Sequence, residues 1–283
     1  MNLALHTAGI IGLGVMGGSI ARALRDSVRD LRILAVEANP EVRASALAAG
    51  VVNEALEAPS DALALCEVVF LCTPVAAAES LLGPVSRAMA DGAILTDVCG
   101  AKERLLACAR DAVRPEVSFV AAHPLFGAPP GWARARADLW TGGTVAICTD
   151  SPASPAALDR VAQLHAHLGA RVVRCLASEH DAATAVTTHL PHLLASALAL
   201  SARSSGPLVW ALAKANSGLR EMTRLAELAF DAQGDLARRN RHLPAVAQKL
   251  QADFQRLLGA VVDSPESARA ALEAARTARG ELL

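Results

Sequence analysis

The N-terminal part of the chain alternates short apolar runs with longer stretches in which apolar residues recur at helical spacing. The runs are four to six residues long and rich in valine, isoleucine, leucine and alanine. They cover residues 8–11, 33–36, 68–72, 93–97, 117–121, 144–149 and 170–174. Continuous apolar runs of this length are typical of buried parallel strands. Strands that alternate with helices predict an α/β fold with a doubly wound parallel sheet, in which ligands bind beyond the carboxyl ends of the strands.

From Ser178 to the end of the chain the pattern is helical. Breaks are expected at Gly206-Pro207, Gly218 and Asp263-Ser264-Pro265. The change of pattern predicts a domain boundary near residue 175, with an all-helical domain over residues 176–283. Within it, residues 193–200 are apolar nearly all round. A small domain cannot bury such a helix by itself, so we expect a homodimer.

The first apolar run is followed by a glycine-rich turn, Gly12-Leu13-Gly14-Val15-Met16-Gly17, and then by a predicted helix. This order of strand, turn and helix is the context in which the pattern G-x-G-x-x-G binds a dinucleotide. Gly12 allows the tight turn, Gly14 lets a pyrophosphate approach the backbone, and Gly17 lets the helix pack against the strand. The N–H groups at the helix start then face the phosphates. The alternative interpretation is a glycine-rich turn in another kind of α/β domain.

The second apolar run ends on Glu37, twenty residues after Gly17. A carboxylate at this place accepts hydrogen bonds from the ribose hydroxyls and repels a 2′-phosphate. The next residues, Ala38-Asn39-Pro40, include no arginine that could receive such a phosphate. Thr73-Pro74 closes the third run, so it is predicted to lie at the same edge of the sheet. We therefore expect a Rossmann-type dinucleotide-binding domain over residues 1–175, with NAD as its cofactor.

Composition and charge narrow the function classes. The formal net charge is −1, which does not favour a nucleic-acid partner or an anionic membrane surface. Hydrophobic residues make up 53% of the chain, yet no apolar run reaches the roughly 18 residues of a membrane span. The first residues lack the basic region of a signal peptide. The six cysteines form no C-x-x-C pair, so we expect a cytoplasmic protein without disulfides or a zinc site.

Three polar clusters are candidates for chemistry. His123-Pro124 follows a predicted strand at the cofactor edge, Thr188 to His192 lies in a helical stretch, and Thr223-Arg224 follows some thirty residues later. Each has a plainer interpretation: a loop histidine, two histidines on one helix face, and a solvated arginine. Because no third ligand stands at suitable spacing from His189 and His192, a metal site is not expected.

Together these features resemble the prephenate and arogenate dehydrogenase family. The matching segments run over nearly the whole chain. They are Gly12 to Gly17, Thr73-Pro74, Thr96-Asp97-Val98 with Lys102, His123 to Gly127, Glu179-His180-Asp181, Thr188 to His192, and Thr223-Arg224-Leu225-Ala226. The resemblance implies a nucleotide-binding domain followed by a helical domain that also makes the dimer. It further implies NAD-dependent oxidative decarboxylation of a cyclohexadiene in tyrosine biosynthesis.

The resemblance also implies roles for individual residues. His123 would accept the proton of the ring hydroxyl while hydride leaves the same carbon for the nicotinamide and CO₂ leaves the opposite side of the ring. Arg224 would hold a substrate carboxylate in a fork. His192 would line the pocket for the ring and its side chain. His189 and Thr188 would orient the helix or contact cofactor and substrate.

The chain departs from the family pattern in three places, all near the ring substituent of the substrate. Where the family has a serine that contacts the ring hydroxyl, this chain has Gly100. Where a hydroxyl residue and a glutamate follow the histidine block, this chain has Ala128-Pro129-Pro130. A tryptophan expected beyond Arg224 corresponds to Gln233. Prephenate, arogenate and 4-amino-4-deoxyprephenate therefore stay open as substrates.

Two other classes of function stay open as well. A β-hydroxyacid dehydrogenase shares the glycine turn but relies on a lysine and an asparagine four residues apart on a helix, whereas Lys214 and Asn216 are two apart. A non-catalytic sensor would bind a dinucleotide and regulate through its dimer. The presence of both His123 and Arg224 argues against a sensor, because it needs neither a base nor an anion clamp.

Overall fold

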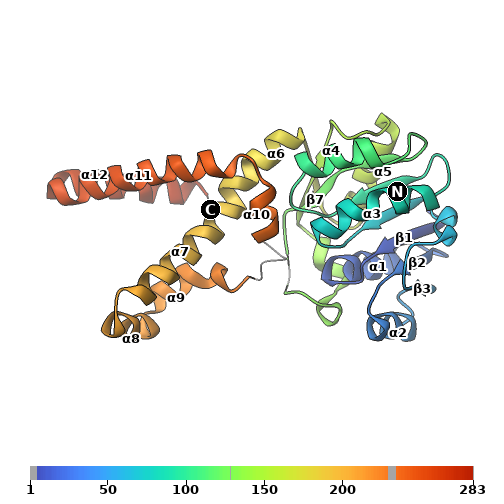
Figure 1. Cartoon of the computed structure of the whole chain (residues 1–283), viewed down its shortest axis with the longest axis horizontal. Helices are drawn as coiled ribbons and strands as arrows, with labels where there is room; N and C mark the ends of the chain where they lie inside the picture. Colours follow the sequence, from blue (N-terminus) through green and yellow to red (C-terminus); the bar gives the residue numbers. More distant parts are fainter. Residues whose placement is uncertain (1–4, 128, 229–233, 283) are drawn as a thin grey trace. The chain divides into compact units, whose positions relative to one another are not determined.

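The computed structural model describes residues 5–127, 129–228 and 234–282 (Figure 1). Residue contacts divide the chain into two compact units. The first comprises Met1–Thr184 and Leu228–Asn240, and the second comprises Ala185–Glu227 and Arg241–Leu283. By contact density, the first unit thus extends past residue 175 and takes in a later segment. The division of the chain into domains at residue 175 stays a prediction.

The first unit is built on a parallel sheet with the strand order β3-β2-β1-β4-β5-β6. Its strands are β1 (Thr7–Ile11), β2 (Arg32–Val36), β3 (Glu54–Leu56), β4 (Val68–Leu71), β5 (Ile94–Asp97) and β6 (Ser118–Val120). The connecting helices are α1 (Val15–Ser27), α2 (Pro40–Ala48), α3 (Val75–Ala88) and α4 (Glu103–Ala112), with a 3₁₀ turn at Asp61–Leu65. Because β1 pairs with β2 on one side and β4 on the other, the strand order reverses there and forms a crevice for a ligand. The predicted doubly wound α/β fold is confirmed.

Two of the predicted strands belong to a different, three-stranded sheet. Its members are β7 (Ala122–Pro124), β8 (Thr144–Cys148) and β9 (Arg171–Cys175), of which β7 runs antiparallel to β8. The run 117–121 therefore does not continue as one strand, since the chain changes sheets at Ala121, whose carbonyl accepts the N–H of Cys148 (2.9 Å). The apolar pattern predicted where these strands lie but not which partners they choose. The remaining helices of this unit are α5 (Pro155–His167), α6 (Ala177–Thr184) and α10 (Asp235–Arg239), with 3₁₀ turns at Trp132–Arg134 and Ala137–Trp140.

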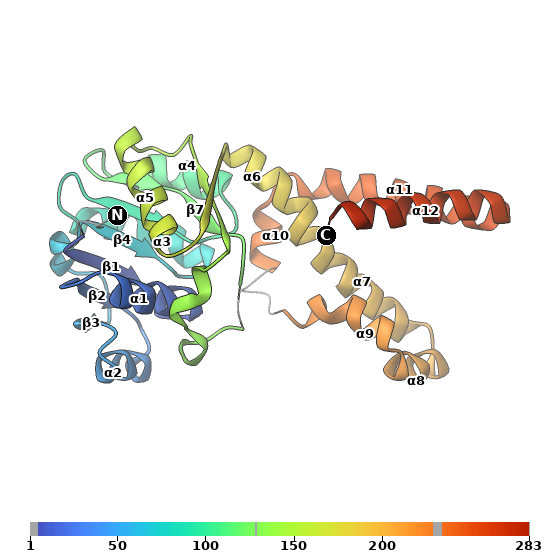
Figure 2. The same ribbon diagram turned by 180° about the vertical axis from the view of Figure 1, so that it is seen from behind.

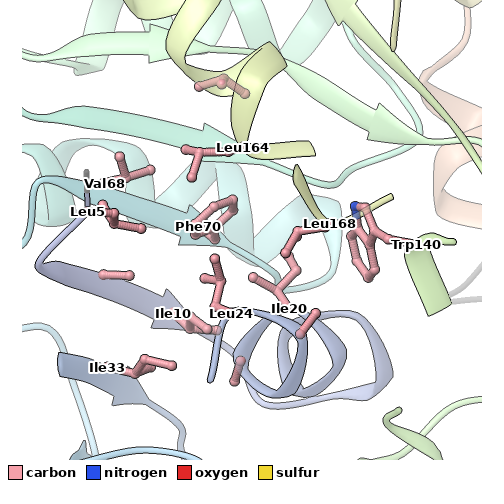
Figure 3. Close-up of a cluster of buried hydrophobic side chains, with 14 of the residues drawn as sticks. Leu5, Ile10, Ile20, Leu24, Ile33, Val68, Phe70, Trp140, Leu164 and Leu168 are labelled. Atoms are coloured by element: carbon pink, nitrogen blue, oxygen red, sulfur yellow. The ribbon is translucent and has the colours of Figure 1, made fainter. Parts of the chain in front are cut away.

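A hydrophobic core lies between the parallel sheet, α1 and α5 (Figure 3). Phe70 of β4, Ile20 of α1 and Leu164 of α5 are completely buried in it. The rings of Trp140 and His165 are nearly parallel, and the indole N–H donates to Nδ1 of the histidine (3.0 Å). Burial lowers the pKa of His165 to about 4, so the ring is a neutral member of the core. This packing fixes α1 against the sheet and so fixes the glycine turn that precedes it.

The second unit is helical. Its helices are α7 (Leu190–Ser204), α8 (Pro207–Ala215), α9 (Ser217–Thr223), α11 (Leu243–Asp263) and α12 (Pro265–Glu281), with a π-helical turn at Ala185–His189 and a 3₁₀ turn at Arg224–Glu227. Figure 2 shows α11 and α12 side by side. Two expected breaks are confirmed: Gly206, with a φ of +110°, precedes α8, and the hydroxyl of Ser264 caps α12. The break expected at Gly218 instead lies at Asn216, whose side chain caps α9. Among the described residues, no helix is long and apolar enough to cross a membrane.

Candidate cofactor and active site

The turn between β1 and α1 has the geometry that the glycine pattern predicts. Gly12 has a φ of +90°, and a Cβ there would lie 2.8 Å from the carbonyl oxygen of Cys72. A Cβ on Gly17 would lie 1.9 Å from the carbonyl oxygen of Gly12. Around the corresponding point at Gly14, no atom of the described residues lies within 4 Å. The turn is therefore tightly packed on its protein side and open where a pyrophosphate would approach.

Glu37 contacts this turn directly. Its Oε2 accepts the N–H of Leu13 (2.7 Å), and its Oε1 accepts the N–H of Asn39 (2.9 Å). An arginine does come close, although none follows directly in the sequence: Nη1 of Arg43 donates to the carbonyl oxygens of Glu37 (2.6 Å) and Ala38 (2.8 Å). Arg43 thus donates to backbone carbonyls, while the carboxylate of Glu37 contacts the turn through the N–H of Leu13.

Two cavities that share residues open at the carboxyl ends of the strands. The larger, of about 560 Å³, is lined by the glycine turn, Glu37 and Thr73-Pro74. The smaller, of about 300 Å³, shares Gly14 and Thr73-Pro74 and extends to Gly100 and Leu236. The hydroxyl of Thr73 is buried and has no hydrogen-bond partner within the described parts of the chain. A bound ligand could satisfy it.

His123 lies in β7, not in a loop after a strand, and it is the first of three linked side chains. Its Nδ1 is 2.8 Å from Nε2 of His180, and Nδ1 of His180 is 2.7 Å from Oδ1 of Asp181. The carboxylate of Asp181 also accepts the N–H groups of Lys102 and Glu103 at the start of α4. Burial by itself would raise the pKa of Asp181, but these hydrogen bonds outweigh it and hold that pKa below its usual value.

The hydrogen-bond series determines the tautomers that we assign. Ionised Asp181 accepts Nδ1–H of His180, so with both rings neutral Nε2 of His180 accepts Nδ1–H of His123. The lone pair of His123 is then on its Nε2. A Cβ added to Gly100 would lie 3.3 Å from this nitrogen. The series thus presents a proton acceptor beside Gly100, a residue that lines the smaller cavity.

A buried ion pair fixes the two backbone segments next to Nε2 of His123. Nζ of Lys102 lies 2.5 Å from Oδ2 of Asp97 and donates to the carbonyl oxygen of Ala122 (2.6 Å). Both side chains of the pair are fully buried. Asp97 also accepts the N–H groups of Cys99 (2.8 Å) and Ala122 (3.1 Å). These bonds hold the turn that contains Gly100 and the strand that contains the catalytic candidate in one arrangement.

The thiols near the site are not activated. Cys72 and Cys99 line the smaller cavity, and burial raises the pKa of both. They are therefore protonated at neutral pH and poor nucleophiles. In the described part of the chain, no three His, Cys, Asp or Glu residues cluster as metal ligands would.

The other predicted substrate residues belong to the second unit. Thr188 and His189 lie in the π-helical turn before α7, a feature that is frequent at functional sites. His192 lies in the first turn of α7, and its Nδ1 is buried without a hydrogen-bond partner among the described residues. Arg224 begins the 3₁₀ turn that packs against α7. Its side chain is exposed and forms no ion pair with a described acidic residue, so the guanidinium is accessible.

The sequence indicated no individual roles for His180, Asp181 and Leu236. For the first two there was a usable signal, because two adjacent ionisable residues follow the last strand at the start of a helix. The sequence gives no such signal for Leu236, because this residue lies in the later segment, Leu228–Asn240, that joins the first unit only in the folded structure. Of the departures from the family pattern, Ala128 and Gln233 lie outside the described residues.

Comparisons with known proteins cover both halves of the chain. Residues 20–174 match the family model of the prephenate dehydrogenase nucleotide-binding domain, and residues 176–269 match that of the prephenate dehydrogenase dimerization domain. Prephenate dehydrogenase of Bacillus subtilis is 27% identical over 230 residues, which are 80% of this chain and 62% of that protein. The probable prephenate dehydrogenase NovF of Streptomyces niveus is 31% identical over 263 residues, which are 87% of this chain and 69% of that protein.

The chain thus spans less than two thirds of the length of the Bacillus subtilis relative. Among solved structures, prephenate dehydrogenase from Aquifex aeolicus in complex with hydroxyphenyl propionate and NAD⁺ has a TM-score of 0.93. The match covers 100% of both chains at 22% sequence identity. At this identity the likeness demonstrates a common fold.

Proposed function

The chain belongs to the prephenate dehydrogenase family, and we propose from this that it catalyses the NAD-dependent oxidative decarboxylation of a prephenate-like cyclohexadiene. Such a ring has a carboxylate on a quaternary carbon and a hydroxyl on the carbon opposite. Loss of hydride from the hydroxyl-bearing carbon and of CO₂ from the quaternary carbon leaves an aromatic ring. Because aromatisation drives the reaction, the protein has chiefly to orient the ring and accept the hydroxyl proton.

The first unit has the groups that a nicotinamide dinucleotide requires. Gly14 leaves room for the pyrophosphate, and Glu37 offers a carboxylate for the ribose hydroxyls. Thr73, whose buried hydroxyl has no hydrogen-bond partner among the described residues, lines the same cavity, with Pro74 beside it. When bound, NAD supplies the hydride acceptor.

The linked histidines carry the proposal. His123 is the catalytic base: its Nε2 accepts the proton of the ring hydroxyl while hydride and CO₂ leave, and it then returns this proton to the oxygen of the aromatic product, which is a phenol. The imidazolium that forms keeps its Nδ1–H bonded to His180, and the charge of Asp181 behind that ring stabilises it. His180 and Asp181 act through His123, so they are positioning residues. Gly100 would face the ring substituent, because it is the neighbour of the accepting nitrogen.

The resemblance to the family supports roles for residues of the second unit as well. The guanidinium of Arg224 binds a substrate carboxylate through two parallel hydrogen bonds. His192 lines the pocket for the ring and its side chain, and its unsatisfied Nδ1 supports this role. Thr188 and His189 orient the start of α7 or contact cofactor and substrate.

We also infer a homodimer. Leu193, Leu194, Leu198 and Leu200 of α7 are 41%, 47%, 38% and 68% exposed, so much of this apolar helix is not covered by the described residues. The match of residues 176–269 to a dimerization domain supports a second copy as the cover. All six cysteines are free thiols, which supports a reducing, cytoplasmic location.

The test is steady-state turnover of prephenate, arogenate and 4-amino-4-deoxyprephenate by the purified full chain, with NAD and with NADP. Reduced nicotinamide is followed by absorbance, and the product is identified by chromatography. We expect NAD-dependent formation of the aromatic product from at least one of the three. Tight NAD binding without turnover of any of them would favour the non-catalytic regulator instead.

A second candidate keeps the reaction and replaces the ring hydroxyl by an amine. Gly100 favours it, because the position that faces the ring substituent has no hydroxyl side chain. The base would then take its proton from an ammonium group. The β-hydroxyacid dehydrogenase alternative gains no support: Lys214 lies in α8, and the side chain of Asn216 is engaged in capping α9.

A further inference from the structure

The short helix α10 is anchored in the first unit by buried polar contacts. Nη1 of Arg239 lies 2.6 Å from both carboxylate oxygens of Glu79 in α3, and its Nε donates to Asp235 (3.0 Å). The side chains of Arg239 and Glu79 are only 6% and 12% exposed. Directly after the helix, Nδ2 of Asn240 donates to the backbone carbonyl of Asp181 (2.6 Å). These contacts fix α10 to α3 and to the residue that supports the catalytic histidine.

This anchoring presents Leu236 to the smaller cavity. Leu236 is half-buried, packs against the hydrophobic core of the first unit and lines the cavity beside Gly100. A Cβ built on Gly100 would lie 3.0 Å from Cδ1 of Leu236 and 3.3 Å from Nε2 of His123. Carbon atoms in good contact are roughly 3.5–4.0 Å apart, so the methyl group takes the space of the first side-chain atom at position 100.

We propose that Leu236 is a specificity-determining residue, which together with Gly100 forms an apolar wall against the ring substituent that His123 deprotonates. The proposal rests on the proposed function of His123. A side chain at position 100 crowds the leucine at 236, which must then give by a few tenths of an ångström, so we expect the two positions to be coupled. In this chain the substituent meets an imidazole acceptor and a methyl group, and position 100 offers no side-chain donor.

The wall predicts a coupled response to two substitutions. Gly100→Ser by itself must push Leu236 or His123 aside by a few tenths of an ångström, so we expect kcat/KM to fall about tenfold for every substrate. Leu236→Ala by itself enlarges the cavity and should chiefly raise KM. In the double variant the new side chain has room. We expect Gly100→Ser to cost less than about threefold in that background, a coupling within the usual range for residues in contact.

Specificity gives the second readout. In the double variant the introduced hydroxyl can donate to the oxygen of a ring hydroxyl, whereas it can only accept from an ammonium substituent, which has no lone pair. The ratio of kcat/KM for prephenate to that for the amino analogue should therefore differ about tenfold between Leu236→Ala and the double variant. Val113→Ala is the matched control: it shortens a half-buried aliphatic residue of the same core cluster, at the other end of α4 from Lys102. Val113→Ala should change kcat/KM by the same factor for all three substrates.

A parallel urea-unfolding cycle on the same variants tests the steric part without any substrate. Gly100→Ser should destabilise the chain more when Leu236 is present than when it is alanine. If the effects of the two substitutions simply multiply in kinetics and add in unfolding, Leu236 does not occupy this space and the proposal is wrong. Inactivity of the wild-type chain toward all three substrates overturns the proposed function and the specificity role with it. The unfolding cycle would still report on the packing in that case.

Discussion

Replacement of His123 by asparagine tests the centre of the proposed mechanism. Asparagine keeps a polar side chain on β7 but has no group that accepts a proton at neutral pH. The supporting groups do not depend on the imidazole: Asp181 remains bonded to His180 and to the start of α4. The substitution therefore removes the proton acceptor while leaving its surroundings in place.

The size of the effect follows from what His123 does in each state. Loss of a positioned general base typically costs 10²–10⁴-fold in rate, or about 3–5 kcal/mol of transition-state stabilisation. In the ground state the imidazole makes one hydrogen bond to the ring hydroxyl, and an asparagine carbonyl can replace part of it. We therefore expect kcat to fall 10²–10⁴-fold while KM and the Kd for NAD change little.

The assay is initial-rate kinetics across a pH series, with NAD affinity measured separately by fluorescence titration. We expect the wild-type profile to have an acid limb, because a protonated imidazole cannot accept a proton, and this limb should vanish in His123→Asn. His180→Phe gives a graded control. It removes the partner of Nδ1–H and so destabilises the imidazolium, which should move the acid limb to lower pH with a smaller loss of kcat. Retention of more than about a tenth of wild-type kcat by His123→Asn would refute its assignment as the base.

Four further predictions concern the cofactor, the substrate, the assembly and the core. NAD should be preferred over NADP in kcat/KM, because the carboxylate of Glu37 repels a 2′-phosphate; a preference for NADP would mean that the ribose end is misassigned. Arg224→Ala should raise KM by the equivalent of about 2–4 kcal/mol without changing NAD affinity, and Arg224→Lys should restore only part; an unchanged KM would make it a surface residue. Leu200→Glu should shift the chain toward monomers in sedimentation, whereas a wild-type monomer at micromolar concentration would contradict the dimer. The pKa of His165 is about 4 in the folded state and near 6.5 in the unfolded state, so the unfolded state binds an extra proton between these two pH values. The free energy of unfolding should therefore fall as pH falls through this window, by roughly 3 kcal/mol in total. His165→Gln should remove this part of the pH dependence in urea unfolding.

The glycine turn and its acid could be predicted because their signals are local. The positive φ of Gly12 and the close approach at Gly17 need glycine at these positions, and Glu37 follows the next strand in sequence. The same holds for the helix starts at Pro207 and Ser264, where proline or a capping hydroxyl lies within the first turn. Such features depend on a few neighbouring residues, so a single sequence carries them.

The arrangement around His123 could not be predicted, because it depends on partners far along the chain. The apolar run 117–121 has the composition of one buried strand, yet its end pairs with β8, and periodicity does not encode the choice of partner. His180 reaches His123 across 57 positions of sequence. Leu236 comes to the cavity because α10 is held there by the ion pair between Arg239 and Glu79, which are 160 positions apart in sequence. Each contact is simple chemistry, but the fold has to be known before it can be recognised.

The unsatisfied groups of the structure give an independent argument for where ligands bind. Five buried side-chain atoms among the described residues have no hydrogen-bond partner, and each such atom typically costs about 1–3 kcal/mol. Two of them, Oγ1 of Thr73 and Nδ1 of His192, belong to residues that the sequence had already assigned to cofactor and substrate. By contrast, the carboxylates of Asp97 and Asp181 are saturated by protein donors. The fold therefore saturates the carboxylates that hold His123 in position, whereas two of the five unpaired atoms lie in residues that we propose to contact cofactor and substrate.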